Sequence, residues 1–150
     1  MNADRAIQNL LVEYCECFDA GDFDAFAALF SDGTWFATAG EGPGAEPVRR
    51  WCEENVLLYD GLPHTQHVTT NVWLDIRDRE HAEARSYVTI WQGLADFPLQ
   101  AIFSGRYHDQ LELVGGRWRF ASRWALPDVI GDMSRHVRTP MPPGPLRSRG

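Results

Sequence analysis

The stretch Leu111-Glu112-Leu113-Val114-Gly115-Gly116-Arg117-Trp118-Arg119-Phe120 carries the strongest local folding signal in the chain. Two adjacent glycines supply the positive φ angles that a two-residue hairpin turn requires. On either side of them, apolar and polar residues alternate, which is typical of strands with one buried face. This stretch therefore predicts an antiparallel hairpin near the end of the chain.

The sequence before this hairpin also has the pattern of strands, back to Thr65. Apolar and polar residues alternate from Thr65 to Ile76, and the charged residues 77–80 predict a turn into a second strand over residues 82–91. A long strand is expected over residues 99–114 and the last one over residues 117–126. Strands that follow one another in this way predict a four-stranded antiparallel sheet.

Helical periodicity replaces this alternation in the first third of the chain. Residues 3–20 place apolar side chains on one face of a helix, namely Ile7, Leu10, Leu11, Tyr14 and Phe18. Asp22 is expected to cap a second, short helix, a strand is expected over residues 34–38, and a third helix over about residues 46–59. The prediction is an α+β fold in which a curved antiparallel sheet packs on three N-terminal helices and encloses an apolar pocket.

Composition limits the class of protein. The chain has 150 residues, of which 44% are apolar, and this fits one globular domain, expected over residues 1–137. Residues 138–150 contain four prolines and predict a flexible tail. A net charge of -7 disfavours nucleic acid as a partner, and no apolar run is long enough for a membrane helix. We expect a cytoplasmic protein without a secretory leader, and the spacing of its three cysteines predicts no metal site.

Two residues attract attention as candidates for chemistry. Asp19 lies at the C-terminal end of the first helix, where the helix dipole disfavours a carboxylate. It is either a turn former or has a compensating donor, such as His67 or Arg123. His67 lies at the start of a long strand, where a histidine is more often structural than catalytic. His64 could reach the pocket rim, whereas His81, His108 and His136 are expected at the surface.

Two motifs, in order, resemble a known superfamily. Phe18-Asp19-Ala20-Gly21-Asp22-Phe23-Asp24, followed by Ala28-Leu29-Phe30-Ser31-Asp32-Gly33, is similar to the first helical hairpin of the SnoaL-like, nuclear transport factor 2-like superfamily. Gly105-Arg106-Tyr107-His108-Asp109, then Gly116-Arg117-Trp118-Arg119-Phe120 and Arg123, resembles its final hairpin. The resemblance covers nearly all of residues 3–127 and implies a cone-shaped α+β barrel around a deep pocket.

Within that superfamily the sequence is most similar in motif to scytalone dehydratase and hexachlorocyclohexane dehydrochlorinase. Asp19 and His67 fall on the Asp and His that both enzymes use, and Arg123 falls on a functional Arg of the dehydrochlorinase. The resemblance implies a lyase that needs no cofactor. Asp19 would fix the tautomer of His67, His67 would remove a proton, and Arg123 would stabilise the developing charge.

The same resemblance implies which residues contact a substrate. Tyr14 falls on the oxyanion-stabilising Tyr of ketosteroid isomerases, but Thr38 replaces their general base, so an isomerase of that type is not expected. Thr38 also replaces a substrate-binding Tyr of the dehydratase. Further wall positions are expected at Phe36, Leu58, Leu62, Phe103, Tyr107 and Ala125. So apolar a pocket suggests a small cyclic, aromatic or polyketide-like substrate.

Two other functions stay open at this point. A polyketide cyclase or isomerase can use the same scaffold and a similar base. A non-catalytic ligand-binding or assembly module is the other alternative, because a fold alone does not prove chemistry. In every case a homo-oligomer, either a trimer or a dimer, is expected from the number of apolar and aromatic residues in the strands.

Overall fold

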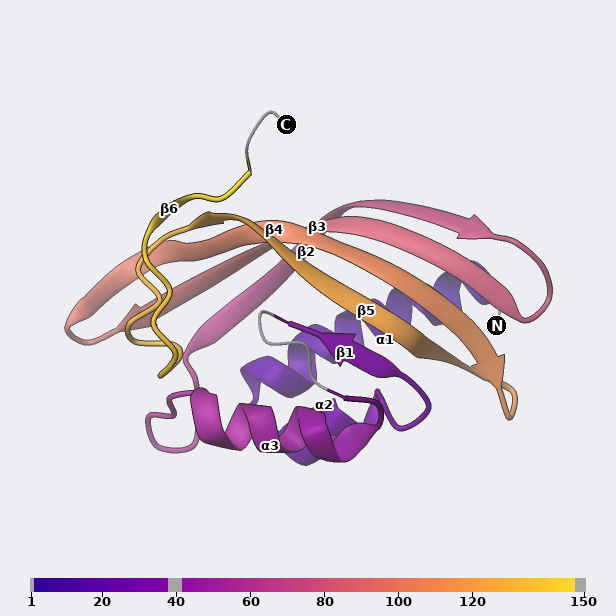
Figure 1. Cartoon of the computed structure of the whole chain (residues 1–150), viewed down its shortest axis with the longest axis horizontal. Helices are drawn as coiled ribbons and strands as arrows, with labels where there is room; N and C mark the ends of the chain where they lie inside the picture. Colours follow the sequence, from indigo (N-terminus) through magenta and orange to yellow (C-terminus); the bar gives the residue numbers. More distant parts are fainter. Residues whose placement is uncertain (1, 38–41, 148–150) are drawn as a thin grey trace.

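The structure, a computed structural model that describes residues 2–37 and 42–147, begins with helix α1 (Ala3–Asp19; Figure 1). The side chain of Asn2 caps this helix by accepting a hydrogen bond from the N–H of Arg5 at 2.9 Å. All five apolar residues expected on one face of α1 are buried, which confirms the predicted periodicity.

The turn after α1 depends on Gly21. Its φ angle is +69°, and a Cβ atom there would lie 2.4 Å from the carbonyl oxygen of Gly61. Asp22 then caps α2 (Phe23–Ala28), as predicted, by accepting a hydrogen bond from the N–H of Ala25. Gly21 therefore determines where α1 ends, and with it the position of Asp19.

Helix α3 (Ala45–Asn55) is shorter than predicted. Val56 is extended and forms a β-bridge with Val137, and the amide of Asn55 donates to the carbonyl of Trp51. This pairing with a segment far away in the sequence ends the helix, although the local pattern would allow it to continue to about Tyr59.

Six strands form one sheet in the order β1-β5-β4-β3-β2, with β6 paired to β5. Their bounds are β1 (Thr34–Phe36), β2 (Thr65–Ile76), β3 (His81–Leu94), β4 (Phe97–Val114), β5 (Arg117–Ile130) and β6 (Gly144–Pro145). Strands β2 to β5 are antiparallel, as predicted, and Gly115 and Gly116 have positive φ angles in the hairpin turn. Two details differ from the expectation: β1 runs parallel to β5, so the sheet is mixed, and the sheet is not closed into a barrel.

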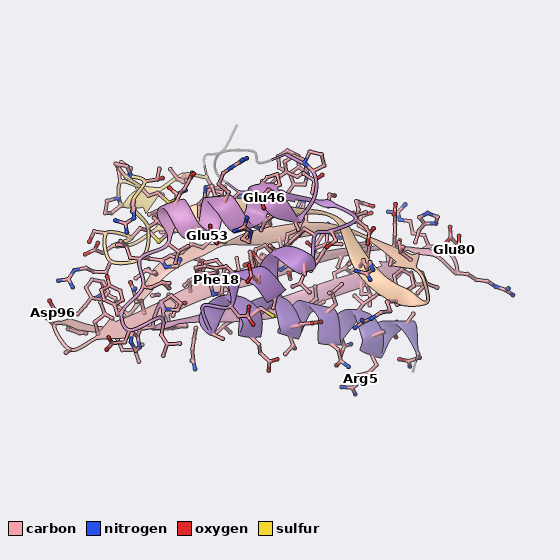
Figure 2. The ribbon with its side chains drawn as sticks, turned by 90° about the horizontal axis from the view of Figure 1, so that it is seen from below. Arg5, Phe18, Glu46, Glu53, Glu80 and Asp96 are labelled. Carbon is pink, nitrogen blue, oxygen red and sulfur yellow. The ribbon has the colours of Figure 1, made fainter. Side chains whose placement is uncertain are left out.

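The sheet arches over the three helices, which all lie on its concave side (Figure 1). Figure 2 shows Glu80 and Asp96, from the turns at the two ends of β3, at opposite ends of the molecule, with α1 along the sheet between them. The predicted α+β architecture is confirmed. The proline-containing segment up to residue 147 returns to the sheet, where β6 pairs with the end of β5.

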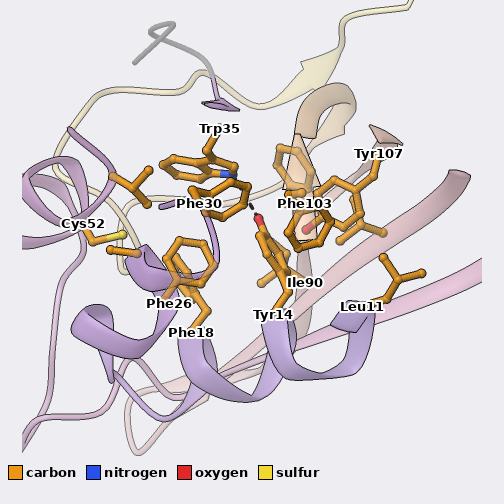
Figure 3. Close-up of a cluster of buried hydrophobic side chains, with 14 of the residues drawn as sticks. Leu11, Tyr14, Phe18, Phe26, Phe30, Trp35, Cys52, Ile90, Phe103 and Tyr107 are labelled. Atoms are coloured by element: carbon orange, nitrogen blue, oxygen red, sulfur yellow. Dashed lines mark hydrogen bonds between the residues drawn. The ribbon is translucent and has the colours of Figure 1, made fainter. Parts of the chain in front are cut away.

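Aromatic side chains fill the space between sheet and helices (Figure 3). Phe30 stacks on Phe120 with ring centroids 5.1 Å apart, and Phe26 packs edge-on against Trp35 at 5.6 Å. Burying such rings is the main favourable contribution to the stability of the fold. Several residues of this core, among them Tyr14, Phe18 and Trp35, also line the cavity described below.

Candidate active site

Asp19, the last residue of α1, binds the first residues of β2 through three hydrogen bonds. Its Oδ1 atom accepts from the hydroxyl of Thr65 at 2.8 Å and lies 2.6 Å from Nδ1 of His67, and Oδ2 accepts from the His67 backbone N–H at 2.7 Å. Among the described strands, β2 pairs only with β3, so alternate N–H groups of β2 point away from the sheet. The carboxylate occupies one of these free positions.

These bonds explain how Asp19 is tolerated at the negative end of the helix dipole. Three donors converge on the carboxylate and offset the unfavourable dipole. Of the two compensating donors considered from the sequence, His67 is present and Arg123 is not. An ionised Asp19 accepts from Nδ1–H of His67, which leaves Nε2 of the imidazole as an acceptor that can take a proton.

His67 reaches an interior cavity of about 70 Å³ under the sheet. Only 4% of its side chain is exposed, and its ring lies 4.7 Å from Phe18 and 6.4 Å from Tyr14, centroid to centroid. The other lining residues are almost all apolar or aromatic and come from every layer of the fold: Tyr14, Phe18, Trp35, Ala37, Trp51, Ile90, Phe103, Tyr107, Ala125, Pro127, Met133, His136, Val137 and Met141.

Tyr14 contributes a hydroxyl group to this apolar cavity. The hydroxyl accepts a hydrogen bond from the indole N–H of Trp35 at 3.2 Å, drawn as a dashed line in Figure 3, and a second one from the hydroxyl of Tyr107. Burial raises the pKa of Tyr14 to about 12, against a smaller lowering by Arg123. Tyr14 therefore stays protonated at neutral pH and can donate a hydrogen bond.

Arg123 lies behind Tyr14 and Tyr107 and is not among the residues that line the cavity. Its guanidinium is completely buried and binds the buried carboxylate of Asp109 through two hydrogen bonds, of 2.7 and 2.8 Å. The guanidinium carbon lies 4.2 Å from the ring centre of Tyr14 and 3.8 Å from that of Tyr107. Arg123 thus makes cation–π contacts with two of the tyrosines that line the cavity.

The residues expected to contact a substrate divide into three groups. Tyr14, Phe103, Tyr107 and Ala125 line the cavity. Three others lie elsewhere: Leu58 and Leu62 are 43% and 42% exposed, and Phe36 stacks on Trp124 at 3.9 Å. Thr38 lies outside the described residues.

The main residue that the sequence did not point to is His136. It was expected at the surface, but it is 3% exposed and lines the cavity with its ring centroid 6.5 Å from that of His67. Its segment follows β5 and has no periodic pattern, so no sequence signal places it there. His81, which was expected to be solvated, is indeed exposed and binds Asp78 at the surface.

The described part of the chain comprises residues 2–37 and 42–147. Within it, no three His, Cys, Asp or Glu side chains gather closely enough to hold a metal ion. No helix there is both long and apolar enough to cross a membrane.

Solved structures of other proteins share this fold. A protein from Novosphingobium aromaticivorans provisionally described as a scytalone dehydratase superposes with a TM-score of 0.73 at 22% identity, over 97% of this chain and 95% of that one. A protein of unknown function from Mycobacterium tuberculosis gives 0.71 at 24% identity, over 85% and 77% of the two chains. A cystatin-like-fold protein from Nostoc punctiforme gives 0.70 at 21% identity, over 85% and 94%. At these identities the likeness shows a shared fold.

The family follows from the sequence profile. The SnoaL-like domain matches residues 1–124, so the chain belongs to the SnoaL-like family, and the resemblance seen in the two motifs is confirmed. This family includes polyketide cyclases and dehydratases. A comparison with curated proteins finds no match.

Proposed function

We propose that this protein is a cofactor-independent acid–base enzyme in which His67, oriented by Asp19, removes a proton from a small hydrophobic substrate. One observation carries the proposal: Nδ1 of His67 lies 2.6 Å from the Asp19 carboxylate while the same imidazole lines an apolar cavity. A structural histidine needs the hydrogen bond but not the cavity. The combination is that of a base with an orienting carboxylate.

The interior cavity is the better place for the substrate. His67 and Asp19 also line a wider groove of about 930 Å³ between α1 and β2, which is open to solvent. Water in that groove would compete for the imidazole and weaken every charge interaction. The cavity on the inner side is lined almost entirely by apolar and aromatic groups, and the ring of Tyr14 lies 6.4 Å from that of His67, centroid to centroid. The groove gives Asp19, whose side chain is 19% exposed, contact with solvent.

The leading reaction is elimination, as in a dehydratase or dehydrohalogenase. Nε2 of His67 takes a proton from carbon, the C–H electron pair becomes the new double bond, and the bond to hydroxyl or halide breaks. Halide leaves as the anion, whereas a departing hydroxide takes the proton back from the His67 imidazolium and leaves as water. General-base catalysis of this kind contributes about 10²–10⁴-fold, so positioning in the cavity has to supply the rest.

A polyketide cyclase or isomerase is the second candidate, because both reactions begin with the same removal of a proton from carbon. The hydroxyl of Tyr14 favours this chemistry, since it can donate to an oxygen that becomes negative as the proton leaves. Arg123 then acts through Tyr14 and Tyr107, which it contacts, rather than by binding the substrate. A non-catalytic ligand-binding or assembly module would not explain why the hydrogen-bonded imidazole of His67 lines the cavity.

Substrate entry requires movement of the side chains around the cavity. Its volume of about 70 Å³ is below the roughly 300–1,000 Å³ of ligand pockets. Met133 and Met141 belong to the lining and come from the segment after β5. Methionine side chains are unbranched and adapt their shape readily, so they are suited to yield to a ring-sized ligand.

A pair of bicyclic substrates tests the proposal. A β-hydroxytetralone loses water, and the matching β-chlorotetralone loses hydrogen chloride, to give the same naphthol, whose fluorescence reports both reactions. Wild-type protein is expected to accelerate at least one of the two. Asp19→Asn and His67→Gln are expected to lower that rate by about 10²–10⁴-fold.

The protein provides its own matched control. His81 and Asp78 form an exposed pair with Nδ1–Oδ1 at 2.9 Å, far from the cavity lining. His81→Gln removes the same kind of imidazole and is expected to leave the rate unchanged. If His67→Gln, correctly folded by circular dichroism, turned over the substrates as fast as His81→Gln, the proposed dyad would be wrong.

A further inference from the structure

His136 is held firmly in the cavity wall by the backbone on either side of it. Its carbonyl accepts from the N–H of Leu57 at 2.9 Å, and its own N–H donates to the carbonyl of Met133 at 3.0 Å. The preceding carbonyl, of Arg135, accepts from the amide of buried Gln92 and from the hydroxyl of Tyr59. Bonds to two other segments, residues 57–59 and β3, therefore hold the backbone at His136 in place.

The imidazole of His136 has an incomplete set of hydrogen bonds. Its Nδ1 atom is buried and has no partner among the described residues, although buried polar atoms are nearly always paired. The ring packs against Phe18 at 5.7 Å and against His67 at 6.5 Å, centroid to centroid. A buried polar atom without a protein partner, in a side chain that lines a cavity, indicates a partner that the protein chain does not provide.

The charge state of His136 is also defined by its surroundings. The pKa of His136 is lowered to about 3, mainly by burial and to a smaller extent by the nearby His67, with Asp19 opposing this in part. The ring is therefore neutral at physiological pH, and it stays neutral when His67 becomes charged, because a second cation beside the first is disfavoured. A neutral imidazole can donate one N–H and accept at the other nitrogen.

We propose that His136 is a second catalytic residue, which donates an N–H hydrogen bond to the carbonyl oxygen of the substrate while His67 removes a proton from the adjacent carbon. The inference rests on the proposed function and narrows its substrate class to enolisable carbonyl compounds. The oxygen of a carbonyl lies two bonds from the carbon that loses the proton. A substrate in the cavity that both rings line can thus present the C–H to one and the oxygen to the other.

A neutral donor suits this step physically. Negative charge builds up on the oxygen as the C–H bond breaks, and a positioned donor in an apolar cavity stabilises it there. A charged imidazolium at the same place would repel the His67 imidazolium that forms in this step. Removing one such donor typically lowers the rate about 10²–10³-fold. Tyr14, which also lines the cavity with its ring 6.4 Å from that of His67, is the natural second donor.

Two variants separate donation from packing. His136→Leu removes the ring nitrogens, whereas His136→Gln keeps an N–H donor of similar reach. With the β-hydroxytetralone as substrate, the expected loss is about 10²-fold or more for leucine and less than about tenfold for glutamine. His81→Gln, at the exposed pair outside the cavity lining, provides the control and is expected to turn over the β-hydroxytetralone at the wild-type rate.

Binding of a naphthol, which mimics the enolate, tests the inference without turnover. NMR of the wild-type protein with isotope-labelled histidine nitrogens is expected to show a shift of the His136 signals on addition of the naphthol. His136→Leu is expected to bind it at least about tenfold more weakly, equivalent to 1.4 kcal/mol. Unchanged His136 signals with bound naphthol would overturn the inference, and so would equal losses of rate in His136→Leu and His136→Gln. Either result would leave the role of His67 intact. Failure of the naphthol to bind would also overturn it.

Loss of activity in His67→Gln but not in His136→Leu would refute the role of His136 alone, whereas a rate unaffected by His67→Gln would refute the proposed function.

Discussion

Replacing Arg123 by leucine is predicted to destabilise the protein strongly, because it leaves the Asp109 carboxylate buried without a counter-charge. Both side chains are 0% exposed and are joined by two hydrogen bonds. Breaking a buried ion pair from one side costs about 3–5 kcal/mol. The lost contacts of the guanidinium with Tyr14, Tyr107 and Phe120 add to this value. Denaturant unfolding of wild type and variant measures the difference.

The double variant Arg123→Leu with Asp109→Leu distinguishes structural from direct roles. Without a lone buried charge, it is expected to recover at least half of the lost stability, because a hydrophobic pair can replace a buried ion pair. If Arg123 only supports Tyr14 and Tyr107, this folded variant keeps its activity within about tenfold. A loss of less than about 1 kcal/mol in Arg123→Leu would refute the reasoning. A well-folded but inactive double variant would instead show that Arg123 acts on the substrate.

Three further predictions follow from particular positions. Gly21→Ala is expected to lower the unfolding free energy by about 1–3 kcal/mol in thermal or denaturant melts, because of its φ of +69° and the close Gly61 carbonyl, whereas Gly115→Asn, with φ +57° and open space, is expected to be tolerated. The lowered pKa of His136 means that the unfolded chain binds its proton first as the pH falls. Relative to His136→Gln, wild type should therefore lose about 1.4 kcal/mol of unfolding free energy per pH unit from the unfolded pKa of 6.5 down to the folded pKa of about 3. Equal slopes for the two proteins would contradict this; Asp19 and His67 are the ionisable neighbours. Light scattering is expected to show a dimer or trimer, since Tyr87, Trp91 and Trp124 are exposed on the sheet, and a monomer at high concentration would refute this.

The parts of the structure that could be predicted are those determined by neighbours in the sequence. The glycine pair at Gly115 required a hairpin, the spacing of apolar residues defined the buried face of α1, and Asp22 stood where a cap was needed. Asp19 and His67 were found by resemblance, because each of them alone is as typical of a turn or a core as of a site. Their hydrogen bond is the geometry that resemblance implied.

The parts that were missed depend on contacts between distant segments. Val56 leaves the helical pattern because Val137 pairs with it, and β1 joins the sheet in parallel because β5 extends beside it. His136 enters the cavity wall because the chain turns back after β5, and nothing in its local sequence indicates that turn as a site. Asp109 falls on the same face of β4 as the buried residues Tyr107 and Leu111, but a carboxylate is expected to be exposed, and only its pairing with Arg123 explains its burial.

Hydrogen–deuterium exchange at the carbon next to the carbonyl of a tetralone tests the central claim most directly, because it requires only a base and no leaving group. Proton NMR in deuterium oxide follows the exchange. The account predicts that wild-type protein accelerates it and that Asp19→Asn and His67→Gln reduce the acceleration by about 10²-fold or more, with His81→Gln unchanged. Equal exchange by wild type and both dyad variants would contradict the assignment of His67 as the base.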